Sequence, residues 1–118
     1  MRASLALLAA TAFVALATAG GSAASAPASA TRQPNRDAET ARRNVDNAIV
    51  AIEAWNADHG TYAGATVRKL RAAYHAPLPN VAIVSASRTS YCVESTVRKT
   101  TMRKAGPAAP VVPGRCRR

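Results

Sequence analysis

Side chains able to do acid–base or nucleophilic chemistry are few in this sequence and lie far apart. His59 and His75 are the only histidines, and only His59 has a carboxylate beside it, Asp58. Neighbouring residues on a helix diverge, so Asp58 and His59 cannot belong to one serine triad, and no G-x-S-x-G turn presents a serine. Neither a glycine-rich phosphate loop nor a catalytic pair of carboxylates is present. We therefore expect no enzymatic activity, no metal, no cofactor and no small-molecule substrate.

The two cysteines, Cys92 and Cys116, allow one definite chemical prediction. They lack the C-x-x-C spacing of a metal site, and no histidine lies near either of them in the sequence. Outside the cytosol, two such cysteines are expected to be oxidised to each other. The Cys92–Cys116 disulfide would stabilise the fold by about 3 to 4 kcal/mol in the chain-entropy model. Two free thiols or a metal pair are the alternatives.

The N-terminus has the pattern of a secretory signal peptide. Arg2 precedes an apolar stretch from Leu5 to Ala19, and small residues dominate Gly20 to Ala30. A transmembrane helix needs about 20 apolar residues, so this stretch is short for a membrane span and better suited to a cleaved signal. We expect residues 1–30 to be signal peptide and linker, and residues 31–118 to be a secreted domain, extracellular or associated with the cell wall. An uncleaved membrane anchor is the alternative.

Basic residues are concentrated in the second half of the chain. The sequence has 16 Lys and Arg against 6 Asp and Glu, a net charge of +10, and Glu94 is the only acidic residue after Asp58. Such a field attracts anionic polymers, such as nucleic acid or phosphate-rich wall polymers, although the same composition can serve solubility alone. The candidate contacts are Arg68, Lys69, Arg71, Arg88, Arg98, Lys99, Arg103 and Lys104, with Arg115, Arg117 and Arg118 at the C-terminus.

An amphipathic helix is predicted from Ala38 to about Asp58. Its apolar residues recur at helical spacing and form one stripe, which a helix turns toward the core. Val50 points away from the stripe, either as a lone exposed valine or as the place where another subunit packs. Gly60 is placed to end the helix in the left-handed conformation. The stripe consists of Ala41, Val45, Ala48, Ile52 and Trp55, with Ile49 on its edge.

Prolines determine where this helix is expected to begin. Gly20 to Arg36 contains Pro27 and Pro34, and a proline inside a helix removes a hydrogen bond and clashes with the preceding turn. We therefore expect this segment not to be one continuous helix, and Thr31 to Arg36 to be an unstructured lead-in to the domain. Asn35 or Asp37 can then cap the helix by accepting a hydrogen bond from a free backbone N–H of its first turn.

The second half of the chain is typical of a short helix followed by strands. Val67 to Tyr74 is predicted to be helical with Thr66 as its cap, and Pro77-Leu78-Pro79 cannot continue the helix. Alternating apolar and polar residues then predict three strands close enough to form an antiparallel meander. They lie at Val81 to Val84, Tyr91 to Glu94 and Thr100 to Lys104. The proline-rich tail from Gly106 is expected to be an extended loop tied back by Cys116, with a polyproline ligand for a partner as the alternative.

The aromatic residues of the domain fall on predicted inner faces or at the helix exit, which favours core filling. Exposed rings at Tyr74 or Tyr91 would instead favour stacking with single-stranded nucleic acid. Glu53 lies off the apolar stripe and is expected to be solvated. The aromatic set comprises Trp55, Tyr62, Tyr74 and Tyr91.

The order of these elements, and the residues at the helix exit, resemble the globular head of type IV pilins and pseudopilins. Ala51 to Tyr62, AIEAWNADHGTY, is similar to the end of the pilin helix, where family members often read A-x-E-A-Y-x-x-D-x-G-x-Y. Ala82 to Glu94 and the ending Lys104 to Cys116 resemble pilin-like proteins of high-GC Gram-positive bacteria. The resemblance covers roughly residues 42–116. It implies an α+β fold, in which an N-terminal amphipathic helix packs on a small three-stranded antiparallel meander with a C-terminal disulfide loop.

The chain departs from this family at its N-terminus. A prepilin has a short basic leader ending in glycine, then Phe or Met, a glutamate and an unbroken apolar helix, and this sequence has no such junction. The resemblance implies a secreted, non-catalytic, pilin-like module, structural or accessory to a cell-surface or secretion assembly such as a type IV pilus. Its partners would be pilin-like or secretion-assembly proteins, with the membrane involved only if the signal is uncleaved. An extracellular basic protein that binds nucleic acid or a cell-wall polymer is the alternative.

Overall fold

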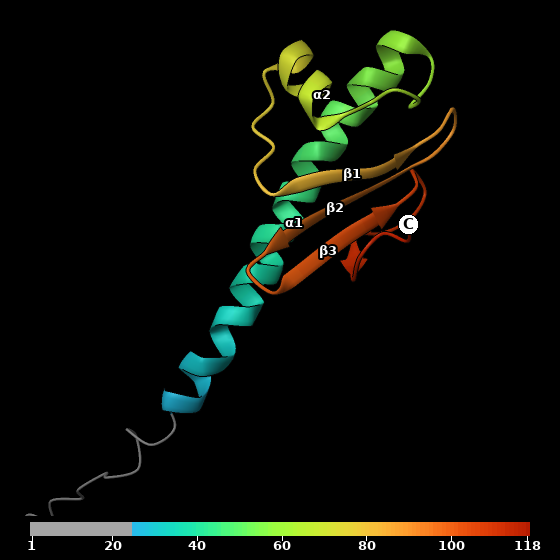
Figure 1. The fold of residues 1–118 in the computed structure, drawn as a ribbon. Helices are drawn as coiled ribbons and strands as arrows, with labels where there is room; N and C mark the ends of the chain where they lie inside the picture. The colour runs from blue at the N-terminus through green and yellow to red at the C-terminus, as the bar shows by residue number, and fades with distance from the viewer. Residues whose placement is uncertain (1–24) are drawn as a thin grey trace, which may run out of the picture.

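The computed structural model of the chain describes residues 25–118, so the apolar stretch predicted to be a signal lies outside the described residues. Two helices are followed by four strands, which form one antiparallel sheet in the order β1-β2-β3-β4. α1 crosses one face of this sheet, and its N-terminal turns extend past the sheet (Figure 1). The elements are α1 (Ser25–His59), α2 (Val67–Tyr74), β1 (Val81–Ala86), β2 (Tyr91–Val97), β3 (Thr100–Ala105) and β4 (Val112–Pro113). The predicted α+β class is confirmed, with a short fourth strand that the sequence did not predict.

The apolar stripe of α1 forms the helical side of the core. All five of its predicted members are buried, and Ile52 is 0% exposed. Burying a side chain of that size contributes roughly 1.5 to 3 kcal/mol, so the stripe is a main reason why α1 stays on the sheet. Val50 is 72% exposed, as its position off the stripe predicts. Gly60 follows the last helical residue with a φ of 69°, which confirms the predicted left-handed end.

The predicted start of this helix is wrong, because α1 begins at Ser25 rather than at Ala38. Pro27 lies in the first turn, where a backbone N–H has no partner within the helix and its loss costs little. Pro34 lies inside the helix and removes one bond, at a cost of about 3 kcal/mol. Residues 32–36, on both sides of Pro34, are exposed.

Asp37 does not cap α1, since the helix begins about three turns before this residue. Its side chain is buried where α1 meets the turn between β2 and β3. There its Oδ1 accepts a hydrogen bond from Gln33 at 3.1 Å and pairs with Arg98 Nη1 at 3.4 Å. Asp37 therefore fastens the helix to the sheet. Asn35, the other candidate cap, is exposed within the helix.

The predicted second helix is confirmed as α2. Thr66 caps it, with its Oγ1 accepting a hydrogen bond from the Lys69 N–H at 3.2 Å. Leu70 is fully buried and anchors α2 to the core. The helix ends at His75, which adopts the left-handed conformation with a φ of 51°.

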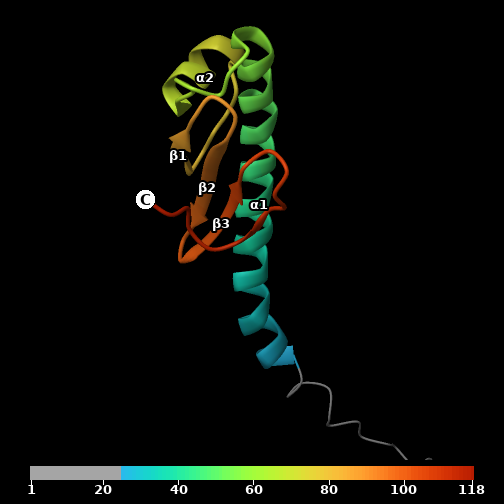
Figure 2. The ribbon, with the colours of Figure 1, turned by 90° about the vertical axis from the view of Figure 1, so that its right-hand side faces the viewer.

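The central strand β2 is covered on both faces. Tyr91, Val93 and Ser95 alternate toward α1, and Asn44 on α1 donates a buried hydrogen bond to Ser95 Oγ at 3.2 Å. The residues between them face the opposite side, where the C-terminal tail lies (Figure 2). All residues from Tyr91 to Ser95 are buried as a result.

Candidate functional site

The disulfide joins β2 to the tail on the sheet face opposite α1, which we call the outer face. Cys92 and Cys116 are bonded with an S–S distance of 2.01 Å and a Cα separation of 6.0 Å, which confirms the predicted pair. Glu94, only 7% exposed, accepts a hydrogen bond from the Cys116 backbone N–H at 2.8 Å. Arg103 Nη1 donates to the Arg115 carbonyl at 2.6 Å. The tail is thus held by a covalent bond and by two charged side chains.

Lys104 holds the start of the same tail. Its Nζ donates to the carbonyl of Pro107 at 3.1 Å and to the carbonyl of Ala109. β4 then pairs with β3, with Val112 opposite Arg103. The segment from Pro107 to Pro113 is therefore part of the fold, as the prediction of a pinned surface loop requires.

Glu53 and two tyrosines form a polar cluster between α1 and β2. The Tyr62 hydroxyl donates to both oxygens of Glu53, at 2.9 and 3.1 Å, so Glu53, which is half-buried, is partly solvated and has a protein partner as well. The Tyr62 and Tyr91 rings meet edge to face, with their centroids 4.9 Å apart. Burial, followed by the charge of Glu53, raises the pKa of Tyr91 to about 12. Tyr91 is 3% exposed and cannot stack on a nucleic-acid base.

The other aromatic residues are engaged at the exit of α1. The His59 ring stacks on Trp55 at 3.7 Å, and its Nδ1 lies 3.0 Å from the Trp55 carbonyl oxygen. The Tyr74 hydroxyl donates to Asp58 at 2.6 Å, and this hydrogen bond raises the pKa of Tyr74 to about 12. Asp58 and His59 therefore have separate partners. Within residues 25–118, no group of three or more His, Cys, Asp or Glu side chains is arranged to hold a metal ion.

The predicted basic contacts are distributed over several parts of the surface. Three of them lie in the turns between β1 and β2 and between β2 and β3, which are at opposite ends of the sheet (Figure 1). Some of the side chains are also bonded internally, including Arg71, whose Nη2 donates to the Leu78 carbonyl at 2.7 Å. The positions are Arg68, Lys69 and Arg71 on α2, Arg88 before β2, Arg98 and Lys99 before β3, and Arg103 and Lys104 on β3.

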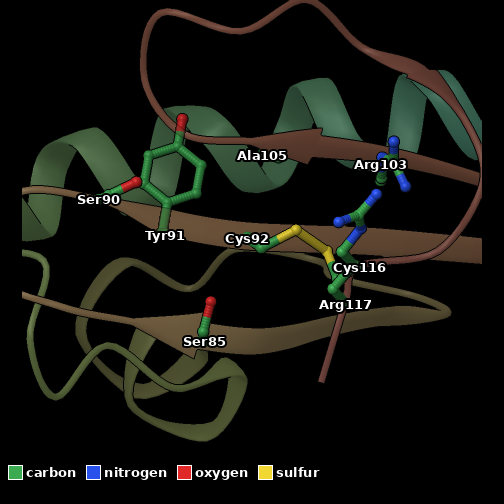
Figure 3. A pocket seen from close by; sticks show the side chains of 8 residues that line it. All are labelled: Ser85, Ser90, Tyr91, Cys92, Arg103, Ala105, Cys116 and Arg117. Atoms are coloured by element: carbon green, nitrogen blue, oxygen red, sulfur yellow. A yellow bond between two sulfur atoms is a disulfide. The ribbon is translucent and has the colours of Figure 1, made fainter.

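Two hollows in the surface differ in chemistry. One, of about 370 Å³, lies on the outer face beside the disulfide and contains two arginines (Figure 3). The other, of about 430 Å³, is mostly apolar and lies between α1 and the segment after α2. Its lining includes Val50, the one large hydrophobic residue that is exposed in the described part of the chain. The sequence pattern indicated Val50 but neither hollow.

Comparisons of the chain with protein-family models, with curated proteins and with solved structures find no match. The class of protein is therefore indicated by the architecture alone. A long N-terminal helix packed on an antiparallel sheet, with a disulfide near the C-terminus, is an architecture consistent with a pilin-like fold. Neither helix of the described part is both long enough and apolar enough to cross a membrane.

Proposed function

We propose that this protein is a secreted, non-catalytic pilin-like module, a relative of pilin and pseudopilin heads that is structural or accessory to a cell-surface or secretion assembly. The architecture carries the proposal. One helix provides both the core stripe and a projecting end, and the sheet behind it is locked by the disulfide. Such a module presents surfaces rather than a reaction centre.

The true start of α1 supports this proposal. The sequence suggested that Gly20 to Arg36 interrupts any long helix, whereas Ser25 to Arg36 is helical and continuous with the packed part of α1. At a rise of 1.5 Å per residue, the whole helix is about 50 Å long. A helix that extends past its own sheet is suited to packing against other subunits.

Val50 marks the surface most suited to a protein partner. It is exposed on α1 beside the apolar hollow, which also includes Ala51, Ala54 and Pro77. The exposure of apolar surface to water is unfavourable, and its burial against a partner is favourable. We therefore place the contact with the assembly on this side of α1, away from the sheet.

Affinity capture from the producing cells tests this role. We expect the tagged full chain to retain pilin-like or secretion-assembly proteins at about 0.5 M salt, where Debye screening shortens charge interactions to a few ångströms. Val50→Asp should reduce the recovery of these proteins severalfold. Ala72→Asp, which adds the same charge at an exposed position of α2, should leave recovery unchanged.

The alternative function, binding of anionic polymers, predicts the opposite salt response. The net charge of +10 supports it, but its eight predicted contacts are spread over both ends of the sheet. Binding to heparin or DNA that disappears between about 0.05 and 0.2 M salt, with no assembly protein retained at high salt, would favour it over the pilin-like role.

A further inference from the structure

The hollow on the outer face brings together polar groups from four parts of the chain. β1 contributes Ser85, the turn before β2 contributes Ser90, β3 contributes Arg103, and the tail contributes Arg117. Figure 3 shows the Cys92–Cys116 disulfide in the middle of this group, with both guanidinium groups on the Cys116 side. The disulfide therefore fixes the position of Arg117 relative to the sheet.

Positive charge in this hollow is not balanced by its own lining. No carboxylate is among the lining residues. Glu94 faces Arg103 across the β2–β3 register, but its Oε2 accepts from the Cys116 N–H, and it makes no ion pair in residues 25–118. Two guanidinium groups that share one hollow repel each other unless an anion lies between them.

Arg103 also has an unused donor. Its Nη1 is bonded to the Arg115 carbonyl, while its buried Nε–H has no partner in the described part of the chain. The Nε–H and Nη2–H groups form the edge of a guanidinium that binds two oxygens of an oxyanion at once. Leaving such a donor unpaired costs free energy.

We propose that this hollow binds a phosphate group, either free or carried by a larger molecule. Its donors are the guanidinium groups of Arg103 and Arg117, which come from β3 and from the tail. A tetrahedral phosphate has enough oxygens to meet them, whereas a planar carboxylate has only two. This site does not depend on the pilin-like role and accounts for only one part of the basic surface.

Titration of the ¹⁵N-labelled full chain, with its disulfide intact, tests the proposal by NMR. At constant ionic strength, sodium phosphate should produce saturable shifts at the amides of Arg103 and Arg117, and sodium acetate should not. Glycerol 3-phosphate identifies the source of the phosphate. Tighter binding than that of inorganic phosphate indicates a phosphate on a larger molecule, and equal binding indicates the free ion.

Two adjacent arginines provide a matched pair of variants. Arg117 and Arg118 are both exposed, but only Arg117 lines the hollow. Arg117→Ala should weaken phosphate binding about tenfold or more, because it removes charge-assisted hydrogen bonds. Arg118→Ala removes the same charge and should change binding about twofold or less at moderate salt. Equal losses in the two variants, or shifts that do not saturate with either phosphate, would overturn the proposal.

Discussion

Tyr62 and Tyr91 are neighbours in the core, but their hydroxyl groups have different surroundings. The Tyr62 hydroxyl donates to Glu53, while the Tyr91 hydroxyl is buried without a hydrogen-bond partner in the described residues. A bonded hydroxyl contributes about 1 kcal/mol of net stability, whereas a buried unbonded one is unfavourable. Two substitutions of the same chemistry should therefore have opposite effects.

We expect Tyr62→Phe to lower the free energy of unfolding by about 1 kcal/mol, since Glu53 loses its donor. Tyr91→Phe should leave it unchanged or raise it by up to about 1 kcal/mol, because only an unpaired polar atom is removed. Urea denaturation at pH 7 to 9 measures both values. A loss for Tyr91→Phe as large as that for Tyr62→Phe would show that the Tyr91 hydroxyl has a partner.

Because the pKa values of Tyr62 and Tyr91 are raised, the free energy of unfolding should fall at alkaline pH. Below pH 10 both tyrosines are neutral in the folded and the unfolded chain, so their contribution is constant. Between pH 10 and about 12 the unfolded chain loses the Tyr91 proton while the folded chain retains it, and stability falls. Tyr91→Phe should make this fall shallower, and an unchanged slope would contradict the raised pKa.

At the scale of elements, the sequence predicted those parts whose pattern is local. The stripe from Ala41 to Trp55, the Thr66 cap and the alternation around Tyr91 each depend on near neighbours, and each is confirmed. The predicted start of α1 is wrong because the effect of a proline on a helix depends on its position in that helix, as Pro27 and Pro34 show. Pro27 costs little in a first turn, and Pro34 lies in the exposed part of the helix from 32 to 36, outside the core.

The tail was predictable only in outline. Its prolines indicated an extended chain, and Cys116 indicated a return to β2. The bonds that fix its path come from Glu94, Arg103 and Lys104, which the sequence offered only as surface charges or as members of strands. Their roles depend on contacts far apart in the chain, as do both surface hollows, so no local pattern could reveal them.

The disulfide should contribute most of the stability of this tail. We expect the double variant Cys92→Ala and Cys116→Ala to unfold with a free energy about 3 to 4 kcal/mol lower. Because the stripe of α1 packs on the opposite face, the variant should keep its helical circular-dichroism signal at low denaturant. Guanidinium denaturation of both proteins measures the difference. A variant as stable as the parent would mean that the tail packs equally well without the covalent bond.

At the scale of the whole molecule, some surfaces of the helix and sheet are buried in the core and others stay exposed. The stripe of α1 and the inner face of the sheet close the core, and the tail closes the outer face of β2. The exposed parts of the described residues include residues 32–36 of α1, the surface around Val50 and the arginine hollow beside the disulfide. A non-catalytic module of an assembly needs contact surfaces of this kind on a rigid support.

Photo-crosslinking on intact cultures of the producing cells, which include the cell surface and the secreted material, tests that conclusion most directly. A benzoylphenylalanine probe would replace Val50 in one chain and Ala82, an exposed residue of β1, in another. We predict that the probe at position 50 is joined on irradiation to a pilin-like or secretion-assembly protein, identified by mass spectrometry, and that the probe at position 82 is not. If neither probe captures such a protein, or if both capture the same proteins equally, the surface of α1 has no specific partner and the proposed role is wrong.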